Sequence, residues 1–165
     1  MLEKYKFRKY SEKYLKLFEQ EKERLMKILP NSAIEHIGST SIVGLGGKAV
    51  IDILIYVNKN QINSCYKKLI GNGYFFRKSG SGKNRIFFEK EYGILFKNWF
   101  HIHLTSSKNV MRKALFFRNL LRKNRKLFNK YLDLKKEAIK RNLKGKDYRN
   151  IKNKFVSSVL KNGRT

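Results

Sequence analysis

Residues 50–57, which read VIDILIYV, constrain the fold of this 165-residue chain more than any other segment. The run is rich in β-branched residues and almost wholly apolar, and Asp52 is its only charged residue. Such a run is typical of a central strand that is covered on both faces, because alternate side chains of a strand point to opposite faces of its sheet. It predicts a sheet with a layer of structure on each side.

The segments around this strand alternate between helical and extended patterns. Apolar residues recur at helical spacing over residues 11–29 and 62–70, and short extended patterns cover residues 33–38, 74–77, 85–89 and 94–104. The last three extended segments are consecutive and predict a β meander. From residue 108 onward three apolar stripes have helical spacing only. We therefore expect an α/β (α+β) fold, with a core over residues 1–107 and a basic helical subdomain over 108–165 in a single compact unit.

The charge balance indicates a polyanionic partner. The chain has 39 Lys and Arg against 12 Asp and Glu, for a formal net charge of +27, and residues 101–165 carry 20 of the basic and 3 of the acidic residues. RNA, DNA, a nucleotide or an anionic lipid surface fits this excess. The codon bias of an AT-rich genome is an alternative source of the many lysines, although that bias would also enrich Glu, which is scarce here.

Other features predict a cytoplasmic protein. Cys65 is the only cysteine, so no disulfide can form within the chain, and its place in an apolar helical pattern predicts a core residue. The first residues lack the apolar stretch of a signal peptide, and no apolar run approaches the ~20 residues of a transmembrane helix. Nothing in the sequence specifies an oligomeric state.

The segment that precedes and enters the apolar strand is the best candidate for chemistry. Residues 34–53 contain a glycine-rich loop with one lysine, but the loop fits neither the Walker A pattern nor the dinucleotide fingerprint. Gly38 and Ser39 would allow close approach of a phosphate, and Lys48 would neutralise its charge. Asp52 would face the same pocket and hold Mg²⁺. The other reading of Asp52 is a buried acceptor of backbone N–H groups from the loop.

These residues resemble the run e-H-I-G-S-T-A-V-P-G-L-A-A-K-P-I-I-D-I of the GrpB family, a branch of the polymerase-beta-like nucleotidyltransferase superfamily. The run is matched at His36, Ile37, Gly38, Ser39, Thr40, Gly44, Leu45, Lys48, Ile51, Asp52 and Ile53, while Val43 and Ala49 replace its two prolines. Later matches follow in the same order. Residues 100–104 match an H-L-H-V strand, and residues 117–122 match an F-R-D-Y-L-R helix. The Y-x-x-L-K pattern is matched by Tyr131, Leu134 and Lys135, and the last helix is matched at Tyr148, Lys152 and Phe155.

The resemblance implies a nucleotidyltransferase-like mixed β-sheet flanked by helices, and it implies an NTP as substrate. The expected reaction moves a nucleotidyl group to an acceptor with the help of Mg²⁺ or Mn²⁺, and the net charge favours RNA, tRNA included, as the acceptor. In the superfamily two carboxylates stand two residues apart on the strand after the Gly-Ser turn, and a third comes from a later strand. Here Leu54 occupies the second position, so only Asp52 of that pair is present.

Histidines offer a replacement for the missing carboxylate. His101 and His103 are two residues apart on an expected strand and so share a face, and His36 precedes Gly38. The candidate site therefore consists of three groups: catalytic Asp52, His103 and Lys48; phosphate-binding Gly38, Ser39, Thr40, Lys48, Arg118 and Arg122; and metal-binding Asp52, His36, His101 and His103.

Each of these assignments has a structural alternative. The histidines fit hydrogen-bonded structural roles, Ser39 and Thr40 fit turn or helix caps, and Arg118 and Arg122 fit a solvated basic face. Asn119 replaces the aspartate of the family pattern, which would leave both arginines freer to bind an anion. Trp99, Tyr92, Phe87 and Phe88 fit core packing better than base stacking. At the level of the whole protein, the alternatives are a nucleotide- or RNA-binding protein that has lost catalysis and, third, a transferase that modifies small molecules.

Overall fold

The structure is a computed structural model, and it describes residues 6–93 and 98–162. The elements follow one another in the order α1 Lys13–Ile28, β1 Ala33–Ile37, β2 Ile51–Tyr56, α2 Ile62–Gly71, β3 Phe75–Phe76, β4 Ile86–Tyr92, β5 Asn98–Thr105, α3 Lys108–Lys123, α4 Arg125–Lys140 and α5 Gly145–Asn162. Short 3-10 turns at Ser39–Ser41, Lys59–Gln61 and Lys78–Gly80 connect some of them. The expected alternation of strands and helices, followed by helices alone, is confirmed.

The strands form one mixed sheet in the order β1-β2-β5-β4-β3. Strands β2 and β5 are parallel, and the other neighbours are antiparallel. Strands β3, β4 and β5 therefore form the expected meander, and the apolar strand β2 has a partner on each side. The expected strand over residues 94–104 is present from Asn98, and its first four residues lie outside the described part of the chain.

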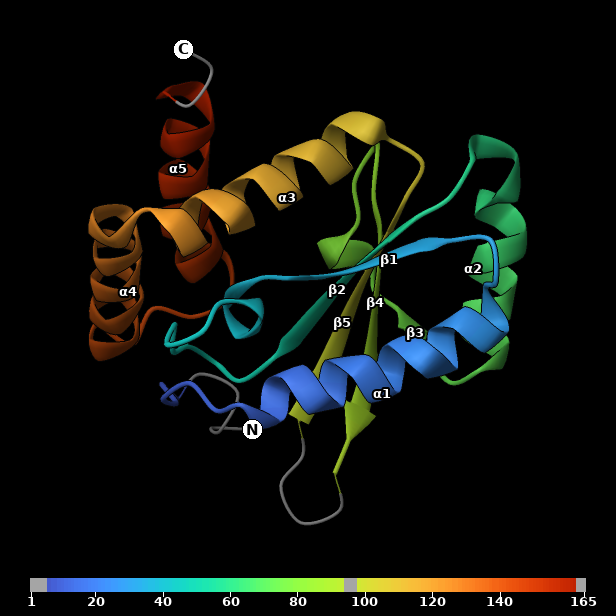
Figure 1. The fold of residues 1–165 in the computed structure, drawn as a ribbon, viewed down its shortest axis with the longest axis horizontal. Helices are drawn as coiled ribbons and strands as arrows, with labels where there is room; N and C mark the ends of the chain where they lie inside the picture. The colour runs from blue at the N-terminus through green and yellow to red at the C-terminus, as the bar shows by residue number, and fades with distance from the viewer. Residues whose placement is uncertain (1–5, 94–97, 163–165) are drawn as a thin grey trace.

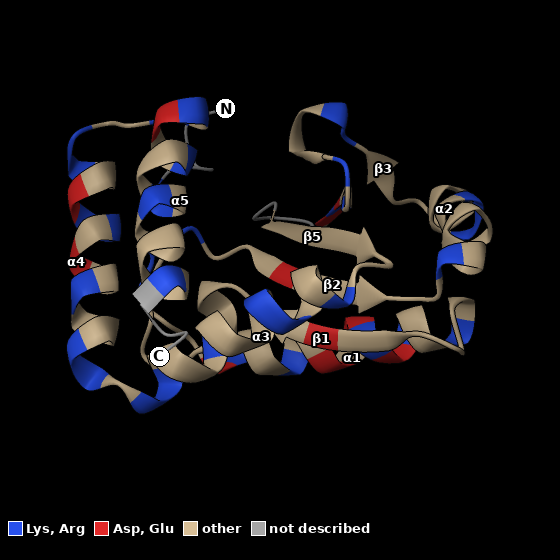
Figure 2. Ribbon diagram, turned by 90° about the horizontal axis from the view of Figure 1, so that it is seen from above, with Lys and Arg blue, Asp and Glu red and all other residues tan. Residues whose placement is uncertain are grey.

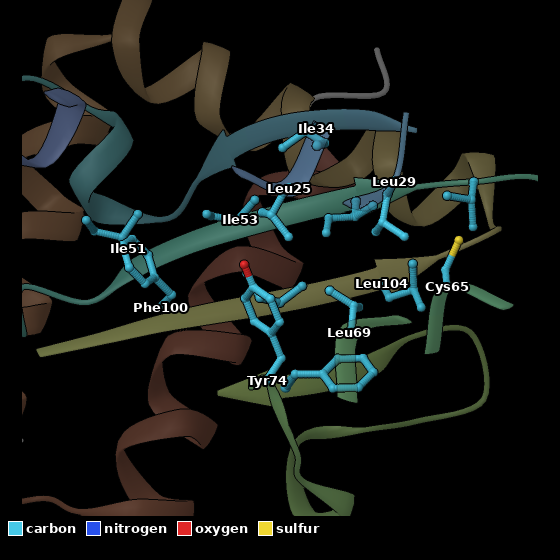
Figure 3. Close-up of a cluster of buried hydrophobic side chains, with 14 of the residues drawn as sticks. Leu25, Leu29, Ile34, Ile51, Ile53, Cys65, Leu69, Tyr74, Phe100 and Leu104 are labelled. Carbon is cyan, nitrogen blue, oxygen red and sulfur yellow. The ribbon is translucent and has the colours of Figure 1, made fainter. Parts of the chain in front are cut away.

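One face of the sheet is covered by α1 and α2 and holds the main core. Alternate residues of the central strands, such as Ile51 and Ile53 of β2 and Leu104 of β5, pack in one cluster with Leu25 and Leu69 of the two helices (Figure 3). Cys65 is buried in this core, as its apolar helical pattern predicts. The other residues of β2 and β5 point to the opposite face, which bears the candidate site.

The helical tail packs against the glycine-rich loop and the β1–β2 side of that opposite face. Ile42 and Leu45 of the loop form a second buried cluster with Leu121, Phe128 and Tyr131 of α3 and α4. Helices α4 and α5 lie at one end of the molecule, and α2 lies at the other (Figure 1). Helix α3 begins at the expected position, Lys108. The second cluster joins residues from before and after Lys108, so the division into a core and a subdomain stays a prediction.

None of the described helices is both long and apolar enough to cross a membrane.

Candidate functional site

Asp52 lies at the start of β2, directly against the turn that precedes the glycine-rich loop. Gly38 has φ +72°, and a Cβ at this position would overlap the Asp52 Oδ2 atom. Glycine is therefore required here both by the backbone conformation and by the close approach of the carboxylate. The loop then returns past Ser39, which lines the same cavity as Asp52.

Two histidines of β5 contact the same oxygen of Asp52. The His101 Nδ1 atom lies 3.3 Å from Asp52 Oδ1, and the His103 Nε2 atom lies 3.4 Å from it. The ring of Phe87 on β4 packs against both imidazoles, with centroids 4.9 Å and 5.2 Å away. The expectation that His101 and His103 share a face is confirmed, and the structure brings both of them to Asp52.

Glu89 of β4 extends this cluster by a second carboxylate. Its Oε1 atom lies 3.4 Å from His101 Nε2, at ion-pair distance but without hydrogen-bond alignment. Its Oε2 atom accepts a hydrogen bond of 3.0 Å from Arg77 Nε. The register pairs Asp52 with His101 and His101 with Glu89, so the three side chains form one row across the sheet.

The surroundings shift the pKa values of the two histidines in opposite directions. Burial alone would lower the pKa of His101, but its contacts with Asp52 and Glu89 outweigh burial and raise it. For His103 burial dominates and lowers the pKa, and the nearby charge of Arg85 lowers it further. Burial alone would raise the pKa of Asp52, yet the two histidines hold it well below its usual value. At neutral pH Asp52 is ionised, and His103 is neutral with its Nδ1 atom buried and unbonded within the described chain.

These residues form one wall of a cavity of about 300 Å³ whose other walls are strongly basic. Of the described residues that line it, five are Lys or Arg: Lys48, Arg85, Lys135, Arg149 and Lys152. They come from the glycine-rich loop, β3–β4 and helices α4 and α5, and Figure 2 shows how frequent Lys and Arg are along those two helices. The cavity therefore combines an acid–histidine cluster with a binding surface for anions.

Lys135 is the most deeply placed of these cations. Only 2% of its surface is exposed, and its Nζ atom donates a hydrogen bond of 2.5 Å to the Gly46 carbonyl oxygen. Burial, together with the smaller effects of the charges of Lys152 and Lys48, lowers the pKa of Lys135 to about 7. A Cβ at Gly47 would overlap the Lys135 Nζ atom, so this glycine lets the ammonium reach the loop. Lys48 lies with its Nζ atom 3.7 Å above the ring of Tyr148.

His36 does not join Asp52. It pairs with Ile53 across β1 and β2, so its side chain points to the core face, where it stacks on Phe18 with ring centroids 4.4 Å apart. Its Nε2 atom lies 3.0 Å from Thr40 Oγ1, and burial lowers the pKa of His36 to about 4. The assignment of His36 to a metal site with Asp52 is therefore corrected, because the two residues lie on opposite faces of the sheet.

Thr40 also has a structural position. Its hydroxyl donates to the Val50 carbonyl oxygen at 3.0 Å, it is 2% exposed, and it is not among the residues that line the cavity. This hydrogen bond closes the base of the glycine-rich loop. The alternative role in the turn thus describes Thr40 better than phosphate binding does.

Arg118 and Arg122 of α3 bind to the protein itself. Arg118 donates from one nitrogen, at 2.8 Å, to both Glu35 Oε2 and the His36 carbonyl oxygen. Arg122 donates to the Ser41 carbonyl oxygen at 2.6 Å. Neither lines the cavity, and the expectation that the change at Asn119 frees both arginines is wrong, because Glu35 and backbone oxygens bind them. Their hydrogen bonds hold α3 against β1 and the loop.

The residues around Asp52 do not fit a pair of Mg²⁺ ions. That arrangement needs carboxylate oxygens from two positions of one strand, and Leu54, at the second position, is an apolar side chain with 1% exposure. In residues 6–93 and 98–162, no group of three or more His, Cys, Asp or Glu is arranged to hold a metal ion. The Oδ1 atom of Asp52 already contacts the imidazoles of His101 and His103.

Several lining residues were not selected as site residues from the sequence: Arg85, Glu89, Lys135, Tyr148, Arg149 and Lys152. Lys135, Tyr148 and Lys152 did carry a signal, because they are positions at which the sequence resembles the GrpB pattern. Glu89 carried a weaker one, as a charged residue two positions from Phe87 in a strand pattern. What no pattern indicated was that these strands and helices meet at Asp52.

The sheet order, the glycine turn and the acid at the start of β2 define a nucleotidyltransferase-like fold. The chain belongs to the GrpB protein family, whose pattern it matches over residues 4–162. It is similar to UPF0157 protein YqkA of Bacillus subtilis, with 32% identity over 149 residues. That match covers 84% of this chain and 43% of YqkA, so the chain spans less than half the length of this relative.

Two solved structures share the fold. The crystal structure of the conserved protein GrpB from Enterococcus faecalis superposes with a TM-score of 0.75 at 27% identity, covering 97% of this chain and 100% of that one. The Cid1 poly(U) polymerase bound to MgATP superposes with a TM-score of 0.60 at 14% identity, covering 83% of this chain and 46% of that one. The second similarity concerns the fold alone.

Proposed function

We propose that this protein binds an NTP in the cavity around Asp52 and transfers its nucleotidyl group to an RNA acceptor. The observation that carries the proposal is the meeting, in one cavity, of the Asp52–His103 pair with five cationic side chains. A triphosphate has the charge that such a cluster of cations would bind. The nucleotidyltransferase-like fold supports the same reading, since the solved relative that binds MgATP is a poly(U) polymerase.

In the proposed step, an acceptor hydroxyl oxygen attacks the α-phosphorus of the NTP, and the bond from that phosphorus to pyrophosphate breaks. The Asp52–His103 pair, joined by the contact of Asp52 Oδ1 with His103 Nε2, takes the hydroxyl proton, because at neutral pH Asp52 is ionised and His103 is neutral. Lys48, Lys135 and Lys152 stabilise the charge that develops on the leaving pyrophosphate. The NTP would enter as its complex with Mg²⁺ or Mn²⁺. Position 54, where the superfamily has a second carboxylate that helps to bind another metal ion, is occupied by Leu54.

The basic tail favours RNA over a small acceptor. Residues 101–165 contribute 20 Lys and Arg against 3 Asp and Glu. Of these, Lys135, Arg149 and Lys152 line the cavity, and further Lys and Arg lie along α4 and α5 (Figure 2). A polyanion would be attracted to this surface, and a cationic small molecule would be repelled by it.

The second candidate is a protein that binds nucleotide and RNA without transfer. The specific observation in its favour is the buried Leu54 at the position where the superfamily has its second carboxylate. The two candidates share the cavity and differ in a single outcome, the formation of a covalent product.

The test incubates the protein with each α-labelled NTP, Mg²⁺ or Mn²⁺, and total RNA, and measures label on RNA. We expect Asp52→Asn to lower transfer by about 10²–10⁴-fold, the usual contribution of acid–base catalysis, and to change NTP affinity little. The matched control is Asp133→Asn, because Asp133 is exposed on α4, away from the lining residues. Salt-sensitive RNA binding without transfer by the wild type would support the second candidate, and no binding of nucleotide or RNA at low salt would overturn both.

A further inference from the structure

An exposed phenylalanine continues the row of functional side chains across the sheet. The register pairs Asp52 with His101, His101 with Glu89, and Glu89 with Phe75 of the edge strand β3. Directly paired residues point to the same face, so Phe75 lies on the cavity face. Its side chain is 60% exposed, the highest exposure of any aromatic residue among the exposed large hydrophobic residues described. Nothing in the fold of the described chain uses this ring.

The next residue explains how Phe75 is held in this orientation. Phe76 points to the other face, where its ring packs against those of Tyr66 and Phe88 with centroids 5.6 Å and 6.1 Å away. The pairing of β3 with β4 and this packing fix the strand, and alternation then directs Phe75 outward. The exposed ring therefore sits on a rigid support.

The segment between Phe75 and the cavity is basic and preformed. Arg77 and Lys78 follow β3, and Lys83 and Arg85 precede β4, all of them exposed. The connection is closed by hydrogen bonds from Arg77 N to the Phe87 carbonyl oxygen and from Phe87 N to Ser81 Oγ, each 2.9 Å. Its residues Ser79 and Gly80 line the cavity. A chain of phosphates could follow this path from Phe75 to Asp52 beside cationic side chains.

The position of this surface relative to Asp52 decides which part of the reaction it serves. Lys135 and Lys152 belong to α4 and α5, and Lys48 packs on Tyr148 of α5. Strand β3 is three strands from β2, which carries Asp52, and lies next to α2 at the end of the molecule away from α4 and α5 (Figure 2). Three interstrand spacings of ~4.8 Å separate Asp52 from Phe75, on the order of 14 Å. Attacking and leaving oxygens in phosphoryl transfer lie roughly in line, so an acceptor approaches from the side opposite to the leaving pyrophosphate.

We infer that the acceptor is single-stranded RNA that crosses the β3–β4 side of the cavity, with one of its bases stacked on Phe75. The inference rests on the proposed function and assigns the acceptor to a surface of its own. Stacking on an aromatic ring requires an unpaired base, so the surface selects single strands over duplexes. The charges of Lys78 and Lys83, which do not line the cavity, bind the backbone of the same strand.

The test measures the binding of a short, unstructured, fluorescein-labelled RNA by fluorescence anisotropy. We expect Phe75→Ala to weaken binding about 5- to 150-fold, the effect of losing one base stacked on an aromatic ring, and to leave the salt dependence of binding unchanged. Phe75→Trp retains binding. The matched control is Phe116→Ala, which removes an aromatic ring 40% exposed on α3 and leaves RNA affinity as in the wild type. Because Phe75 is exposed, unchanged thermal melting confirms that each variant is folded.

Binding of labelled NTP is measured with the same variants. NTP affinity that falls with Phe75→Ala would overturn the inference, because the ring would then stack on the base of the NTP. RNA affinity equal to that of the wild type, equal binding of a duplex, or no RNA binding by the wild type would also overturn it. If RNA binding depends on Phe75 but no label is transferred, the acceptor surface stands and the proposed transfer fails.

Discussion

At the scale of single residues, the site depends on contacts that tolerate no added atom. Gly38 turns the chain with φ +72° while Asp52 lies where its side chain would be. Gly73 has a similar φ of +79°, but a Cβ there would meet nothing within 4 Å. Gly38 also has ψ −170°, a combination with positive φ that is essentially confined to glycine, so Gly73 is a control for a positive φ without overlap.

We predict that Gly38→Ala lowers the free energy of unfolding by about 2–4 kcal/mol, because strain and overlap with the Asp52 carboxylate add together. Gly73→Ala is the control and should lower it by about 1 kcal/mol from strain alone. Urea unfolding followed by circular dichroism measures both. Equal losses for the two variants would contradict the added cost of the Gly38 conformation and of its overlap with Asp52.

At the scale of the elements, helix α3 is attached to the sheet by charged groups as well as by apolar packing. Arg118, with a side chain 13% exposed, binds Glu35 and the backbone of β1, and Arg122 binds the end of the Ser39–Ser41 turn. The interface holds the tail in place, and with it the cations of α4 and α5 that line the cavity.

We predict that Arg118→Ala lowers the free energy of unfolding by about 1–3 kcal/mol, because Glu35 and the His36 carbonyl oxygen lose their donor. Arg112→Ala, which removes an exposed arginine of the same helix, should change it by no more than about 0.5 kcal/mol. The folded Arg118→Ala variant should bind NTP as the wild type does. Full stability with weakened NTP binding would instead support the anion-binding role suggested by the sequence.

At the scale of the whole molecule, the excess of positive charge includes one buried lysine, Lys135, which lies near other cations. The chain has a net charge of +27, and Lys135 of α4 reaches the Gly46 carbonyl oxygen between the charges of Lys48 and Lys152. Its pKa of about 7 lies well below the usual value for lysine. Between these two values the unfolded chain binds a proton at this position that the folded chain does not, so stability rises with pH there.

We therefore predict that Lys135→Met changes the pH dependence of stability. The free energy of unfolding of the variant, relative to that of the wild type, should be highest near pH 7. This difference should shrink as the pH rises toward 10, where Lys135 approaches neutrality in both the folded and the unfolded wild type. Lys136→Met is the control, because Lys136 is the exposed neighbour with the same formal charge. Urea unfolding over this pH range gives the comparison, and parallel curves for all three proteins would contradict the prediction.

The elements of the fold and part of the site follow from local patterns. The apolar run around Asp52 predicts strand β2, helical spacing predicts α1, α2 and the tail, and the glycine turn predicts a pocket beside Asp52. His101 and His103 belong to the same category, because a separation of two residues on one strand places both on the same face. Each of these inferences needs only residues that are close in the chain.

The histidines show where such inference stops. His36 and His103 both lie on strands that neighbour β2, but His103 pairs with Leu54 and shares its face with Asp52, whereas His36 pairs with Ile53 and faces the core. A shift of one residue in register reverses the face of every side chain on a strand. Register depends on pairing between distant segments, so the sequence pattern alone treats the two histidines alike.

The sequence by itself determined the layers of this protein, its basic tail, and the glycine turn that faces Asp52, because spacing and composition act within single segments. Only the tertiary structure decided which charges meet. It placed Glu89, Lys135 and Lys152 at Asp52, tied Arg118 to Glu35, and turned Phe75 outward at the end of the same row. These contacts join segments far apart in the chain, and strand register and helix docking select them.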